Sequence, residues 1–167
     1  MSVTQHETAI VSPQSQLGQN VDIGAFSIIG SNVQIADGVK IHSHVVIDGH
    51  TRIGTGTEIF PFAAIGLAPQ HTRFDGEASE LIIGENNLIR EYVTLHPGTK
   101  VGNMKTTIGN NNLFYVGAHI AHDCVVGNNV ILANYVGVGG HVTIGDFAYL
   151  GGYSAIHQFV RIGGHAI

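Results

Sequence analysis

An aliphatic residue returns at every sixth position through most of this sequence. The phase runs over residues 11–65, fails across the next two positions, resumes over 83–101, slips by one residue and runs again over 108–162. Of the 24 positions in phase only Phe114 is not aliphatic. A period of six fits neither an amphipathic helix nor an alternating strand, so it predicts short strands joined by tight corners.

Two further columns accompany the aliphatic one. Gly follows the aliphatic residue in 13 of the 24 repeats, and a small or β-branched residue stands four positions after it in most of them. Gly permits positive φ and close backbone approach at corners. Three hexapeptides make one triangular coil of eighteen residues, so the sequence predicts an all-β parallel solenoid of eight coils, spanning residues 1–167 as one domain. Strands of successive coils should lie about 4.8 Å apart.

The period breaks at two places. Residues 67–80 lack inward aliphatic residues and contain Pro69 and Gly76, so we expect them to loop out of the coil. The slip near Lys105 predicts a one-residue insertion or small bulge. Loops on a regular scaffold often carry function, although a tolerated insertion is the alternative.

Composition excludes several classes of function. The formal net charge of -5 and the lack of a basic stripe argue against nucleic-acid binding. Cys124 is the one cysteine, so no intramolecular disulfide is possible and a reducing compartment is expected. The sequence shows no secretory signal and no apolar run long enough to span a membrane, and we expect a cytoplasmic protein.

The repeat predicts where the side chains of a histidine cluster lie in space. Residues eighteen apart stack, so Gly140 and then Gln158 lie over His122, and His141 lies over Asp123. One outer edge of the solenoid therefore gathers His119, His122, Asp123, Gly140, His141, His157 and Gln158.

This edge suggests acid–base chemistry. An imidazole can act as a general base while a carboxylate fixes its tautomer. Gly140 has no side chain over His122, so its N–H can face a developing oxyanion. Ile120 and Cys124 should point inward, which removes Cys124 as a nucleophile. The alternative is that the polar residues are simply solvated.

The run HIAHDC, followed by ILAN, GGHV, DFA and HQF, resembles the UDP-N-acetylglucosamine 3-O-acyltransferases of lipid A biosynthesis. Upstream, SHVVIDGHTRIG, FAAIG, IRE and VTLH are similar to the same family, which belongs to the hexapeptide-repeat acyltransferases. The resemblance implies a left-handed solenoid. It also implies transfer of an (R)-3-hydroxyacyl chain from acyl carrier protein to the sugar 3-hydroxyl, the first step of lipid A biosynthesis.

The resemblance also implies roles for individual residues. His122 corresponds to the general base, Asp123 to its orienting carboxylate and Gly140 to the oxyanion donor. Residues that correspond to substrate contacts or stand at acceptor-binding positions are Gln70, His71, Arg73, His119, His141, His157 and Gln158. Family members are homotrimers with sites in the clefts between solenoids. No metal or cofactor is implied beyond the phosphopantetheine arm of the carrier.

The sequence departs from the family pattern in three ways. Arg73 stands in place of a Lys, and His71 stands in place of an Asp that contacts the sugar, which leaves an N-acetyl or an amino-substituted acceptor open. The family also continues with further coils and a C-terminal helical domain that are absent from this sequence, so we expect a truncated chain.

Other functions remain open on the sequence alone. Another solenoid acyltransferase, acting on a sugar hydroxyl or amine, and a non-catalytic trimeric scaffold both fit the repeat. Zinc is a third alternative, because left-handed solenoids of gamma-class carbonic anhydrases bind it at a histidine edge. Here His119 and His122 have two residues between them, fewer than separate the ligands of those enzymes.

Overall fold

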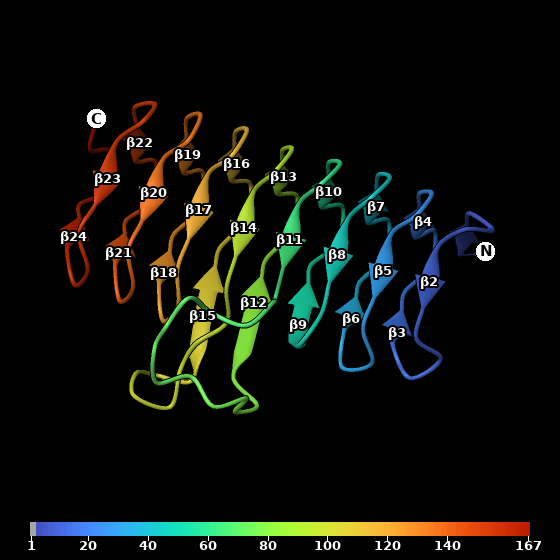
Figure 1. The fold of residues 1–167 in the computed structure, drawn as a ribbon. Coiled ribbons are helices and arrows are strands. Elements are labelled where there is room, and N and C mark those ends of the chain that lie inside the picture. Colours follow the sequence, from blue (N-terminus) through green and yellow to red (C-terminus); the bar gives the residue numbers. More distant parts are fainter. Residues whose placement is uncertain (1–2) are drawn as a thin grey trace.

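Strands of two to four residues alternate with corners along residues 3–167, the part of the chain that the computed structural model describes. Every third strand joins the same sheet and pairs in parallel with the strand one coil earlier, which produces a three-sided prism of eight coils (Figure 1). The predicted left-handed parallel β-helix is confirmed. Residues 3–167 contain no helix, and therefore none long and apolar enough to cross a membrane.

Each sheet has eight strands. The first sheet comprises β1 (Thr4–Gln5), β4 (Asp22–Ile23), β7 (Lys40–Ile41), β10 (Glu58–Ile59), β13 (Leu88–Ile89), β16 (Leu113–Phe114), β19 (Ile131–Leu132) and β22 (Tyr149–Leu150). The second comprises β2 (Ile10–Val11), β5 (Ile28–Ile29), β8 (Val46–Ile47), β11 (Ala64–Ile65), β14 (Thr94–Leu95), β17 (His119–Ile120), β20 (Gly137–Val138) and β23 (Ala155–Ile156). The third comprises β3 (Gln16–Leu17), β6 (Gln34–Ile35), β9 (His50–Ile53), β12 (Glu80–Ile83), β15 (Lys105–Ile108), β18 (Val125–Val126), β21 (Thr143–Ile144) and β24 (Arg161–Ile162).

The aliphatic column of the sequence forms the core. The last residue of most strands points inward, and Ile59, Ile89, Phe114 and Leu132 are fully buried along the first sheet. Each of these side chains therefore packs on the equivalent residue of the coils above and below. Phe114, the one residue of the inward column that is not aliphatic, is fully buried in the same continuous core.

Two loops interrupt the stack. In β9 and β12 the paired residues His50 and Glu80 are thirty apart instead of eighteen, so residues 66–79 leave the coil as predicted. Between β12 and β15, Glu80 pairs with Lys105, twenty-five residues later. The prediction of a one-residue bulge near Lys105 is therefore wrong. Residues 96–104 form a second loop, and Val101, which satisfied the period by chance, lies 40% exposed in it.

The two loops lie together on the corner between the second and third sheets (Figure 1). The Lys100 N–H donates to Glu77 Oε1 at 2.8 Å, and the Lys100 ammonium lies 3.3 Å from Asp75 Oδ2. We call the corner between the second and third sheets, which loops 66–79 and 96–104 cover, the site corner. Two segments that appear as unrelated gaps in the repeat thus cover the same edge.

Side-chain caps organise the corner between the third and first sheets. The carboxylate or amide oxygens of Asp37, Asn110, Asn128 and Asp146 each accept a backbone N–H from the coil before. A Cβ at Gly109 would lie 2.6 Å from Asn128 Oδ1. Glycine follows the aliphatic residue here because the next coil's capping oxygen occupies that space.

Stacked rings occupy the corner between the first and second sheets. Phe26, His44, Phe62 and Tyr92 lie one above the other with ring centroids 5.0 to 5.2 Å apart, within the range of aromatic pairs. All four have positive φ. The three corners therefore carry different chemistry on one backbone repeat.

The close approach of coils at glycine predicts a stability difference between two substitutions. In Gly54→Ala the new Cβ would lie 2.5 Å from the carbonyl carbon and oxygen of Gly84, which are backbone atoms that cannot turn aside. We expect a loss of about 1–3 kcal/mol in the free energy of unfolding, measured by urea denaturation.

Gly137→Ala is the matched control, because nothing lies within 4 Å of its Cβ position. We expect it to change the free energy of unfolding by less than about 1 kcal/mol. Equal losses in the two variants would show that coil spacing does not require these glycines.

Candidate active site

His122 and Asp123 occupy the turn that joins β17 to β18 on the site corner. Asp123 has φ 60°, a left-handed conformation that Asp tolerates better than most residues. Both side chains point away from the coil axis, yet His122 is 4% exposed and Asp123 2%. The loops bury them, so the alternative that these residues are simply solvated is wrong.

Four donors surround the Asp123 carboxylate. Oδ1 accepts the N–H of Thr99 at 3.2 Å and of Asn103 at 2.7 Å, and Oδ2 accepts the Thr99 hydroxyl at 2.7 Å and His122 Nδ1 at 2.8 Å. Burial alone would raise the pKa of Asp123, but these hydrogen bonds outweigh it and hold the pKa below its ordinary value. Asp123 is therefore an anion that fixes a neighbouring imidazole.

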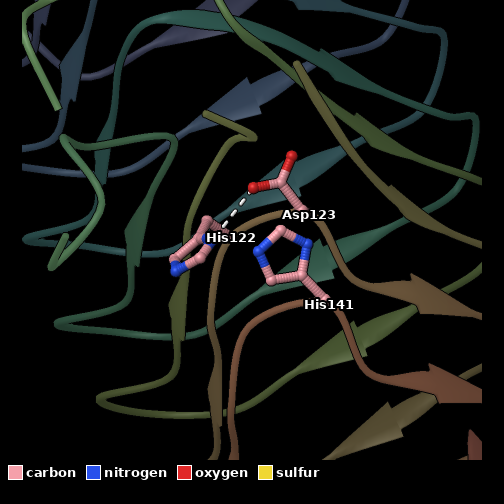
Figure 2. A group of neighbouring side chains, drawn as sticks. All are labelled: His122, Asp123 and His141. Carbon is pink, nitrogen blue, oxygen red and sulfur yellow. Dashed lines mark hydrogen bonds and ion pairs between the residues drawn. The ribbon is translucent and has the colours of Figure 1, made fainter. Parts of the chain in front are cut away.

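The His122 ring has one nitrogen occupied and one free. An ionised Asp123 accepts its hydrogen bond from Nδ1–H, so in the neutral imidazole the lone pair lies on Nε2. Figure 2 shows Nε2 pointing away from Asp123. A Cβ at Gly140 would lie 2.7 Å from Nε2 and 2.5 Å from Cε1, so the ring occupies the space that glycine leaves. The predicted stacking of Gly140 over His122 is confirmed.

The Gly140 N–H has no acceptor within residues 3–167. Asn128 stands at the equivalent place on the neighbouring corner, and its N–H donates to Asp146 Oδ1 at 2.7 Å. The site corner lacks such a capping side chain. A backbone donor is consequently left free beside His122 Nε2, as an oxyanion acceptor requires.

Two further imidazoles flank His122. The His141 ring centroid lies 5.1 Å away and that of His71, from loop 66–79, lies 4.8 Å away, both edge-on. Burial lowers the pKa of His141, whose ring also stacks on Phe159 at 4.4 Å. The structure thus brings His71 to the site from within the same chain.

His119 forms a second imidazole pair with His96. Their ring centroids are 5.3 Å apart, and His119 Nδ1 shares a 2.7 Å hydrogen bond with the Thr94 hydroxyl. Burial, together with His96 and His122 nearby, lowers the pKa of His119 to about 4. His96 Nδ1 donates to the Leu67 carbonyl at 3.0 Å, while its buried Nε2 has no partner within the part of the chain described.

The remaining predicted site residues lie further out. His157 and Gln158 are exposed on the last described coil of the corner, with His157 Nδ1 3.2 Å from the Gln158 carbonyl oxygen. Gln70 and Arg73 are exposed in loop 66–79. Cys124 is fully buried and burial raises the pKa of its thiol to about 11, which confirms its place in the core.

His96, Thr99 and Asn103 belong to the site but are not predicted by the repeat. All three lie in loop 96–104, where the period predicts only a one-residue slip. The sequence signal for this loop is the end of the six-residue period after Leu95. Val101 conceals that end, because it is an aliphatic residue that stands six positions after Leu95 although it lies exposed in the loop.

His122, Asp123 and His141 could together approach a metal ion, since they offer ligand atoms within 4.8 Å of one another. However, both Asp123 oxygens already accept hydrogen bonds from Thr99 and from a second donor. A cation bound by Asp123 would have to compete with those hydrogen bonds. The donor set suits an oriented imidazole better than a metal centre.

Comparison with known proteins agrees with the repeat. The family model "Bacterial transferase hexapeptide (six repeats)" matches residues 14–49 and 105–140. The acyl-[acyl-carrier-protein]–UDP-N-acetylglucosamine O-acyltransferase of Rickettsia typhi is 54% identical over 119 residues, 71% of this chain and 45% of that protein.

Solved structures extend the match along the chain. A UDP-N-acetylglucosamine acyltransferase superposes with a TM-score of 0.94 at 50% identity, covering 98% of this chain and 62% of the other. The Francisella novicida enzyme of the same name gives 0.95 at 39% identity, covering 98% and 59%. The chain spans about half the length of the curated relatives it matches.

The chain belongs to the hexapeptide-repeat transferases. Within that group, its homologues are UDP-N-acetylglucosamine O-acyltransferases.

The depressed pKa of His119 predicts a dependence of stability on pH. Between about pH 6.5 and pH 4 the unfolded chain binds a proton that folded His119 does not, so the stability present above pH 6.5 is lost as pH falls. Urea midpoints measured from pH 7.5 to 4.5 should decline, and the decline should be shallower in His119→Gln. An identical decline in both proteins would assign the effect elsewhere.

Proposed function

We propose that this chain carries the catalytic β-helix of an acyltransferase that moves an (R)-3-hydroxyacyl group from acyl carrier protein to the 3-hydroxyl of UDP-N-acetylglucosamine. The homologues that share the β-helix bear the name of that reaction. The observation that carries the proposal is the buried Asp123–His122 pair, with Nε2 free beside the uncapped Gly140 N–H.

His122 acts as the general base. Nε2 takes the proton of the sugar hydroxyl as its oxygen attacks the thioester carbonyl, and Asp123 stabilises the imidazolium that forms. The Gly140 N–H faces the oxyanion of the tetrahedral intermediate. When the C–S bond breaks, the imidazolium returns the proton to the departing thiolate, which leaves the ester, the free thiol and a neutral His122.

The surrounding residues would bind the substrates. His71 lies against His122, so it can reach an acceptor sugar bound beside the base. The His141 ring lies edge-on against the base, and His119 is near enough for His122 to add to the effect of burial in lowering its pKa. We infer a homotrimer in which Gln70 and Arg73 reach across to a neighbouring site, a cytoplasmic location, and no metal or cofactor besides the phosphopantetheine of the carrier.

His122→Ala tests the proposed base. We expect acyl transfer from (R)-3-hydroxyacyl carrier protein to UDP-N-acetylglucosamine to fall by about 10²–10⁴ in kcat, because general-base catalysis contributes that much. His165→Ala, an exposed histidine on another corner, is the matched control and should keep its activity.

The same assay separates the other functions. Transfer that proceeds only from acetyl-CoA, or only to a sugar amine, would indicate a different solenoid acyltransferase. Unchanged turnover in His122→Ala would contradict the assignment of the base. Absence of any nucleotide-sugar or acyl-carrier binding to a wild-type protein confirmed to be complete would favour a scaffold.

Gly140→Ala tests the proposed oxyanion donor. Its Cβ would collide with the His122 ring and fill the space beside the free N–H, so we expect kcat to fall by about 10²–10³. Gly151→Ala, with nothing within 4 Å of its Cβ, should keep wild-type turnover in the same assay. Full activity in Gly140→Ala would place the oxyanion elsewhere.

A further inference from the structure

Loop 96–104 supplies three of the four donors to Asp123. Two of the three come from one residue, since Thr99 gives its N–H to Oδ1 and its hydroxyl to Oδ2. Asn103 adds its N–H to Oδ1. Thr99 therefore contacts both oxygens of the carboxylate at once.

This two-point contact fixes the plane of the carboxylate. Rotation about the Cβ–Cγ bond of Asp123 would lengthen the 2.7 Å bond to the Thr99 hydroxyl and the 2.8 Å bond to His122 Nδ1 together. Oδ2 thereby stays aimed at Nδ1. Hydrogen bonds to an ionised group are the stronger ones, so the hydroxyl resists such rotation.

Thr99 is itself held firmly. It is fully buried, and its carbonyl oxygen accepts the N–H of Gly102 at 3.0 Å and of Met104 at 3.1 Å. The next residue, Lys100, is tied to loop 66–79 through Glu77. A Cβ at Gly102 would collide with the Asp123 carboxylate, so the turn closes tightly over the anion. The donor geometry is thus fixed before any substrate binds.

We propose that Thr99 is a positioning residue for the acyl transfer. Its hydroxyl sets the orientation of Asp123, and through Asp123 the tautomer and ring orientation of His122, without touching a substrate. This inference rests on the proposed function of His122 as the general base. It gives loop 96–104 a task separate from that of loop 66–79, whose His71 faces the imidazole directly.

Three variants test the role of the hydroxyl. Thr99→Val keeps the size of the side chain and removes its donor, and Thr99→Ser keeps the donor. Thr106→Val is the matched control, because Thr106 is also buried and its hydroxyl has no partner within residues 3–167.

We expect Thr99→Val to lower kcat by about tenfold to a hundredfold while KM for both substrates changes by less than about twofold, since a base held in the wrong orientation slows the chemistry without weakening binding. Thr99→Ser should restore kcat to within about threefold, and Thr106→Val should match the wild type. Unchanged kcat in Thr99→Val, or an equal loss in Thr106→Val, would overturn the proposal.

A spectroscopic measurement separates this inference from the proposed function. In protein labelled with ring-¹⁵N histidine, the His122 Nδ1–H resonance, assigned by its loss in His122→Gln, should shift or broaden in Thr99→Val and be retained in Thr99→Ser and Thr106→Val. That result would support the role of Thr99 even if no acyl transfer is found. A His122 resonance identical in all of these Thr variants would reject it.

Discussion

Parallel stacking in register is the constraint on which the rest of the structure depends. Each strand is two to four residues long and has no stability alone, so it persists because the coils above and below pair with it. The same register aligns side chains into columns. An inward column becomes the core, and an outward column becomes a row of aromatic rings, a row of capping side chains or the histidine cluster of the site corner.

The site uses this register and departs from it. Stacking places Gly140 and His141 one coil above His122 and Asp123, which brings a backbone N–H and a second imidazole near the His122 ring. A buried carboxylate would be costly without partners, and the repeat offers Asp123 only one donor, His122 Nδ1. The nonrepeating loop 96–104 supplies the other three donors, so the repeat sets the spacing of the site and the loop stabilises the buried charge.

The sequence predicts the repeating coils well and the nonrepeating loops poorly. The period predicts the sheets, the inward residues and the stacking of Gly140 over His122, because nothing interrupts the repeat after Ile108. It cannot predict the burial of Asp123, because the bonds from Thr99 come from a loop that does not follow the repeat. Val101 shows the converse error, in which an aliphatic residue meets the period while lying exposed in a loop.

The capped corner also gives the stack a direction. Gln19 is capped by Asp37, Asn110 by Asn128 and Asn128 by Asp146, so each of these three N–H groups is satisfied by a side chain that comes later in the chain. During synthesis from the N-terminus, a coil at this corner is left with a bare donor until about one further coil has emerged. At each of these positions the hydrogen bonding of one coil is therefore completed only by the next coil of the chain.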